Sequence, residues 1–189
     1  MLGTVTFFGG ATIGFMARRP IVCGRFPPPA VNGPLLFTTE VGFIEQPIRA
    51  DNYLGKRVRL SAWVKGHGLG GPIAGLWMRV DGAGVVTGYD NMANRPESGT
   101  TGWHQVAIVL DVPSNALGIV IGAMLQGGGT LGSGTLFIDD MKLETVGSDV
   151  ASTNMAGFPK ANTIDPATTI ANYVHAPTTP ANTDFEQLP

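Results

Sequence analysis

Apolar residues recur at every second position in four separate stretches of this chain, and this pattern limits the fold more than any other feature. Alternate side chains of a β-strand point to opposite faces, so each stretch predicts a strand with one buried face. A fifth stretch, residues 135–143, alternates in the same way but changes phase at Asp139-Asp140, which predicts a β-bulge. The four apolar faces consist of Val58, Leu60, Ala62 and Val64; Ala74, Leu76, Met78 and Val80; Val106, Ile108, Leu110 and Val112; and Ile119, Ile121, Ala123 and Leu125. No helical pattern separates these strands, so the alternation predicts an all-β, antiparallel β-sandwich or barrel.

The composition agrees with such a fold and argues against other classes. The 189 residues include 27 glycines and 14 prolines, which favour turns over helices. Charged residues make up 14% of the chain, against about 25% in ordinary soluble domains. The net charge of −2 gives no support for a nucleic-acid partner, and no apolar run reaches the roughly 18 residues of a membrane span. We therefore expect neither nucleic acid nor a membrane as a partner.

The chain divides into three regions by composition. Residues 1–40 are rich in glycine and proline, and Pro27-Pro28-Pro29 cannot lie inside a sheet, so this region is predicted to be an extended N-terminal arm. Residues 41–146 contain the alternating strands and form the predicted sandwich. Residues 147–189 are rich in alanine, threonine and proline, which is typical of an extended C-terminal arm.

Several blocks of the central region resemble one bacterial module. They are residues 52–65, 74–82, 90–92, 99–103, 110–113 and 137–144. In their order and spacing they are similar to the jelly-roll β-sandwich of galactose-binding-like, carbohydrate-binding-module type, over about residues 42–146. Such modules occur alone, beside catalytic domains, fused to some bacterial regulators, and in phage tail and fibre proteins. The resemblance implies the fold, and it leaves the ligand open.

The same resemblance implies that a sheet face binds sugars, with aromatic rings stacked on the ring surface and polar side chains on the hydroxyls. The residues that could form such a face are Trp63, Trp77, Arg79, Tyr89, Asn91, Met124 and Gln126. The alternative is that the tryptophans pack beneath a loop or an arm, because tryptophan is usually well buried.

Asp139 and Asp140 stand where related modules hold a structural calcium ion. Calcium requires six to eight oxygen ligands, so a third carboxylate is needed, and the family pattern points to Glu186. The alternative is that the two aspartates accept hydrogen bonds from loop N–H groups. Apart from this possible Ca²⁺, no cofactor is expected.

The family's opening motif is absent near the N-terminus, but a similar motif occurs at residues 182–186, with Asn182, Asp184, Phe185 and Glu186. Three explanations remain open. The motif is the start of a second module, a chance match, or a strand that the C-terminal arm donates to the sandwich in cis or to a neighbouring subunit.

No arrangement of residues points to catalysis, since the three histidines lack a metal-ligand spacing and no nucleophile elbow is present. Nine of the 12 basic residues lie in residues 1–80, and 11 of the 14 acidic residues follow them. With the two arms, this asymmetry favours a non-catalytic, self-assembling structural protein, a virion, fibre or filament subunit that forms a homo-oligomer in a virion or extracellular setting. The alternative is a carbohydrate- or small-ligand-binding module that uses the Trp77/Arg79 face. An effector-binding domain of a regulator is a third interpretation.

Overall fold

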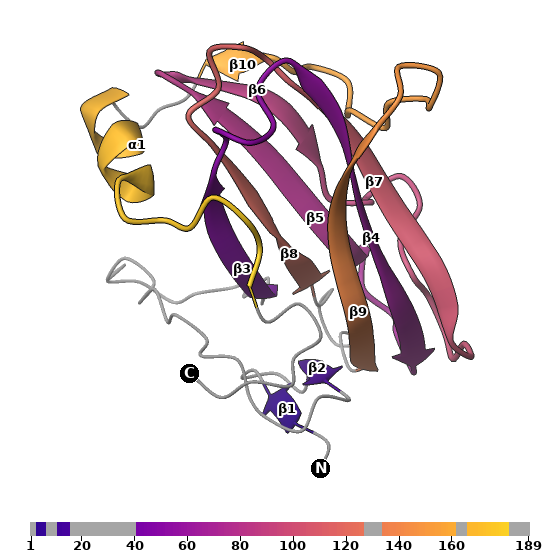
Figure 1. The fold of residues 1–189 in the computed structure, drawn as a ribbon. Coiled ribbons are helices and arrows are strands. Elements are labelled where there is room, and N and C mark those ends of the chain that lie inside the picture. The colour runs from indigo at the N-terminus through magenta and orange to yellow at the C-terminus, as the bar shows by residue number, and fades with distance from the viewer. Residues whose placement is uncertain (1–2, 7–10, 16–40, 127–133, 162–165, 182–189) are drawn as a thin grey trace.

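The protein is an all-β sandwich of two five-stranded sheets, as the sequence predicts (Figure 1). The computed structural model describes residues 3–6, 11–15, 41–126, 134–161 and 166–181. The first sheet has the order β1-β2-β9-β4-β7, with β1 (Gly3–Thr6), β2 (Ala11–Phe15), β9 (Gly134–Val146), β4 (Lys56–His67) and β7 (His104–Val112). The second has the order β10-β6-β5-β8-β3, with β10 (Lys160–Ala161), β6 (Val85–Asp90), β5 (Ile73–Gly82), β8 (Gly118–Gln126) and β3 (Val41–Arg49). One helix, α1 (Pro166–Tyr173), is found among the described residues.

The strand pairs are nested, which is the connectivity of a jelly roll. β5 pairs with β6, β4 with β7, β3 with β8, and β2 with β9, so each outer pair encloses the one before it along the chain. The pairs are antiparallel except for β2 with β9, which is parallel. The parallel pairing of β2 departs from a jelly roll, whose nested pairs are antiparallel, and β1 and β2 extend the first sheet out of the region predicted as an arm.

The core lies between the two sheets and uses the faces that the alternation predicts. The predicted apolar residues of β4, β5, β7 and β8 pack into one cluster, with Val106 at its margin. Leu136 and Ile138 enter this core from the first part of β9, and Met141 enters it from the second part. The phase change is a bulge, because the pairing of β9 with β4 shifts register between Ser61 and Trp63. The predicted bulge is thus confirmed.

The C-terminal region lies on the sandwich of its own chain over residues 147–161 and 166–181, and we call these residues the strap. Thr153 donates its N–H to Val109 O at 2.8 Å, and Met155 donates to Tyr89 O at 2.9 Å. Further along, Arg49 donates to Pro177 O, and Gln46 exchanges two hydrogen bonds with the main chain of Ala181. Figure 1 shows α1 beside the second sheet, near β3 and β8.

Candidate functional site

Four of the predicted ligand-binding residues meet on the outer face of the second sheet. Trp77 packs with Tyr89 and Met124, and the centroids of the Trp77 and Tyr89 rings lie 6.5 Å apart. The Arg79 guanidinium lies 6.0 Å from the Trp77 ring, within the range of a cation–π contact. The alternation therefore groups these side chains on one face, as expected.

Trp77 is packed into this face and offers no free aromatic platform. Its side chain lies across Gly122 of the neighbouring strand, where an added Cβ would come within 2.8 Å of the indole nitrogen. That nitrogen donates to Ile44 O at 3.3 Å, and 4% of the residue is exposed. The indole therefore links β5 across β8 to β3, which corresponds to the packing alternative for this tryptophan.

Arg79 is part of a polar network beneath α1. The Nε and Nη2 atoms of Arg79 donate to Asp81 Oδ2 at 3.1 and 3.0 Å, and Tyr173 OH of α1 donates to the same oxygen at 2.6 Å. Asp81 Oδ1 lies 2.9 Å from Arg79 Nε without hydrogen-bond geometry. Burial, more than the charge of Asp81, raises the pKa of Tyr173, so the hydroxyl stays protonated and acts as a donor. The network thus fastens α1 to the sheet.

Of the other three predicted ligand-binding residues, Asn91 is hydrogen-bonded to Tyr89, whereas Trp63 and Gln126 are not among the residues that pack with Trp77. Trp63 lies on the outer face of the first sheet, opposite Gln105 and Asp139, with 42% of the residue exposed. Asn91 is buried after the end of β6, where its side-chain oxygen accepts the N–H of Ala93. Gln126 ends β8, with Val41 and Ile73 as its strand partners, and is half-buried.

The two aspartates at the bulge make local contacts. Asp140 has φ of 49° and donates its N–H to the Asp139 side chain at 2.8 Å, while its own carboxylate pairs with Lys142 Nζ at 2.8 Å. These contacts correspond to the hydrogen-bonding alternative. Within the ranges that the structure describes, no group of three or more His, Cys, Asp or Glu side chains is placed to hold a metal ion. Glu186 and the other motif residues, Asn182, Asp184 and Phe185, lie outside the described residues.

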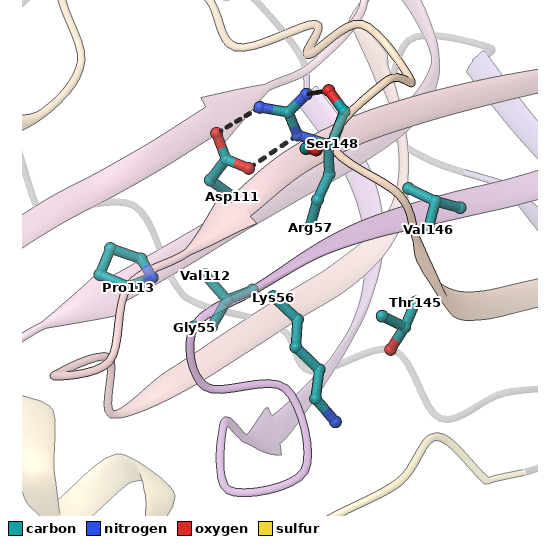
Figure 2. A pocket seen from close by; sticks show the side chains of 9 residues that line it. All are labelled: Gly55, Lys56, Arg57, Asp111, Val112, Pro113, Thr145, Val146 and Ser148. Carbon is teal, nitrogen blue, oxygen red and sulfur yellow. Dashed lines mark hydrogen bonds and ion pairs between the residues drawn. The ribbon is translucent and has the colours of Figure 1, made fainter.

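An open cleft lies at one end of the first sheet, where the end of β7, the start of β4 and the end of β9 meet (Figure 2). Its volume is about 490 Å³, within the range of small-molecule sites. The lining residues are Gly55, Lys56, Arg57, Asp111, Val112, Pro113, Thr145, Val146 and Ser148. None of these was among the site residues predicted from the sequence.

Arg57 and Asp111 form the fixed wall of the cleft. Arg57 Nε and Nη2 donate to the two oxygens of Asp111 at 2.7 and 2.9 Å, as Figure 2 shows. Arg57 Nη1 donates to Ser148 O at 2.9 Å and to Val150 O at 2.6 Å. The hydrogen bond from Arg57 lowers the pKa of Asp111, so this carboxylate remains charged and paired. Little in the sequence indicated this cleft, because Arg57 does not differ from the other polar residues on its face of β4.

Fold and site together define a β-sandwich module with a cleft of small-molecule size. No family model and no solved structure matches the chain. The chain is similar to an uncharacterised HTH-type transcriptional regulator, YbfP, of Bacillus subtilis (strain 168), with 45% identity over 117 residues. The match covers 61% of this chain and 38% of the relative, so the chain corresponds to well under two thirds of that protein.

This relative corrects the functional expectations from the sequence. Its name points to the regulation of transcription, which contradicts both the virion, fibre or filament subunit and the carbohydrate-binding module offered as the alternative. The exclusion of nucleic acid and the preference for a virion or extracellular location are wrong on the same finding, because a transcriptional regulator acts on DNA. The homo-oligomer was expected because the chain was interpreted as a self-assembling structural subunit, and that reason no longer holds. The net charge of the chain was a poor guide, because a regulator can contact DNA through a local element whose charge an average does not show.

Proposed function

We propose that this chain is a non-catalytic regulatory module of a protein that controls transcription. The observation that carries the proposal is the 45% identity, over 117 residues, to a relative named as an HTH-type transcriptional regulator. At that identity the matched segments share a fold and a core, and the role of the segment within the whole protein is what we infer.

A helix-turn-helix motif places two helices against DNA, the second of them in the major groove. In the described residues, α1 is the one helix, and Tyr173 binds it to the sheet. We therefore assign DNA contact to a separate part of the regulator and signal reception to the sandwich. The nested strand pairs support the further proposal that the sandwich is of galactose-binding-like type.

Chromatin immunoprecipitation of the tagged native protein, in the cell that encodes it, tests this function. We expect enrichment at a small number of discrete chromosomal sites. A uniform background, equal to that of a tagged protein with no role in transcription, would rule the proposal out.

Among the residues that the structure describes, no helix is long and apolar enough to cross a membrane.

A further inference from the structure

A second cleft lies between α1 and the end of β3, where Figure 1 shows the helix beside the second sheet. Its volume is about 340 Å³, near the lower end of the range for small-molecule sites. It shares no lining residue with the cleft at the end of the first sheet. It is lined on the helix side by Ile170, Tyr173 and Val174 and on the sheet side by residues that include Arg49, Asp51 and Leu117.

The strand register places this cleft beside the ring that attaches α1 to the sheet. Arg49 pairs with Gly118 across β3 and β8, and Gly118 pairs with Asp81 across β8 and β5. The Tyr173 ring lies over Gly118, and its hydroxyl donates to Asp81. Arg49 therefore lies on the opposite side of the ring from Asp81, and a molecule in the cleft lies against the attachment point of the helix.

The apolar wall of this cleft is accessible. Ile170 and Val174 are 48% and 54% exposed, and residues four positions apart lie on the same side of a helix. Leu117 is half-buried on the sheet side, and its main chain is fixed at both ends. Its N–H donates to Asp81 O at 2.7 Å, and its carbonyl oxygen accepts the N–H of Ala50 at 3.2 Å. The cleft thus offers preformed aliphatic surface to a small apolar group.

An exposed ion pair forms the polar part of the cleft. Arg49 Nη2 lies 2.8 Å from Asp51 Oδ2, and the two side chains are 45% and 48% exposed. Within the described residues, neither side chain forms another ion pair. A guanidinium has five N–H donors and a carboxylate has about four acceptor positions, so both groups keep capacity for a ligand.

The proximity of the two charges selects the class of ligand. A ligand that carries only a carboxylate would meet repulsion from Asp51, and a ligand that carries only an ammonium group would meet repulsion from Arg49. A ligand with both groups on one carbon atom matches both charges at once. An α-amino acid is such a ligand.

We propose that this cleft binds an apolar α-amino acid in its zwitterionic form. The carboxylate pairs with Arg49, and the ammonium group pairs with Asp51. The side chain contacts Leu117, Ile170 and Val174. Because the ligand contacts the helix and the sheet together, it stabilises the attachment of α1. That this amino acid is the effector of the regulator rests on the proposed function, but the binding itself does not.

Titration of the full chain with L-leucine, L-isoleucine and L-valine, followed by amide chemical shifts, tests the site. We expect at least one of them to give saturable shifts at Asp51, Leu117 and Val174, with a Kd below about 10 mM. The controls are 4-methylpentanoate and 3-methylbutylamine, which are leucine without its amino group and without its carboxylate. Each should bind at least about tenfold more weakly than leucine. Absence of saturable shifts with all three amino acids, or equal binding of the single-charge analogues, would overturn the proposal.

Variants of the ion pair locate the two charges. Arg49→Met should weaken leucine binding by about tenfold without weakening that of 3-methylbutylamine, because the carboxylate alone loses its partner. Asp51→Asn should likewise weaken leucine binding without weakening that of 4-methylpentanoate. Arg59→Met is the matched control, because Arg59 is an exposed arginine that pairs with Glu144 on the other sheet, and its loss should leave leucine binding unchanged. Equal leucine affinity of Arg49→Met and wild type would refute the site.

The same measurements separate the ligand from the function of the whole protein. Binding without discrete chromosomal occupancy would refute the proposed function alone, and occupancy without binding would refute the ligand alone.

Discussion

Two glycines of β8 each hold an aromatic ring against the second sheet. A Cβ at Gly118 would lie 2.1 Å from Tyr173 Cε1, and a Cβ at Gly122 would lie 2.0 Å from Ile44 O and 2.8 Å from Trp77 Nε1. These distances are far below ordinary van der Waals contact, so both positions require glycine for close packing. The sequence shows the two glycines but does not show which rings they accept, because Tyr173 is 55 positions away from Gly118 along the chain.

We predict that Gly118→Ala displaces Tyr173 and loosens α1. The added methyl group overpacks the site, which typically costs about 1–3 kcal/mol. Hydrogen exchange at residues 166–176 should become faster and the melting temperature should fall. Gly102→Ala is the control, since nothing lies within 4 Å of a Cβ there. If the two variants exchange equally in this segment, Gly118 does not seat the helix.

His104 has hydrogen-bond acceptors on both sides of its ring, which favour the charged form of the imidazole. Nδ1 lies 3.0 Å from Gly102 O, and Nε2 lies 3.0 Å from Glu97 Oε2. A neutral imidazole has one N–H and can donate to one of these oxygens, whereas the imidazolium donates to both. The bond to Gly102 O, followed by that to Glu97, accordingly raises the pKa of His104 above 6.5.

This pair predicts a pH dependence of stability. Because the folded-state pKa is raised, the stabilising contribution is complete below the unfolded-state value of 6.5 and is lost as the pH rises through the folded-state pKa. The melting-temperature difference between wild type and Glu97→Gln should be largest at acid pH, above the titration of the carboxylates, and should shrink with increasing pH. A difference that grows with pH would show that the sign is wrong.

At the scale of single residues, the sequence predicted which side chains share a strand face and could not predict what covers them. Trp77, Arg79, Tyr89 and Met124 do meet on one face, because period two fixes the direction of each side chain. Whether such a face is open depends on the strap, whose contacts are set by tertiary packing. Tyr173 of α1 donates a hydrogen bond to Asp81, the partner of Arg79, and so attaches the helix to this face.

Among the elements, the strap depends on Arg57 where it leaves the first sheet. One guanidinium joins three segments, because it pairs with Asp111 of β7 and also binds the carbonyl oxygens of Ser148 and Val150. Fork-like donors of this kind suit arginine and cannot be reproduced by a shorter or uncharged side chain.

We predict that Arg57→Met releases the first part of the strap. Amide hydrogen exchange at Val150 and Thr153 should become faster, because Ser148 O and Val150 O lose their hydrogen bonds from Arg57 and this part of the strap is held less firmly. Arg59→Met is the matched control on the same face of β4, since the described contacts of Arg59 are with Glu144. Equal exchange at Val150 and Thr153 in the two variants would contradict this role of Arg57.

The elements that the sequence predicted are those with long, clean alternation. It missed β3, although Ile44 and Ile48 are buried, because Pro47 interrupts the pattern and marks an edge strand. It missed β6, in which the glycine and threonine of the strand weaken the apolar face. It also missed α1, whose eight residues contain one buried aromatic ring and no charge pattern at either end.

At the scale of the molecule, the fold could be predicted because alternation, turns and the absence of helical periodicity agree on a sandwich. The function could not, because low charge and long flanking regions fit an assembly subunit as well as a module with a strap folded back on it. The strap contacts its own sandwich at residues 147–161 and 166–181, which removes one reason to expect neighbouring subunits.

Transcript profiling of the source cell with the gene intact, deleted and restored tests the central claim most directly. If the chain serves a transcriptional regulator, deletion changes a limited and reproducible set of transcripts, and restoring the gene returns them to their original levels. Unchanged transcript levels after deletion, under conditions in which the protein is made, would contradict the account.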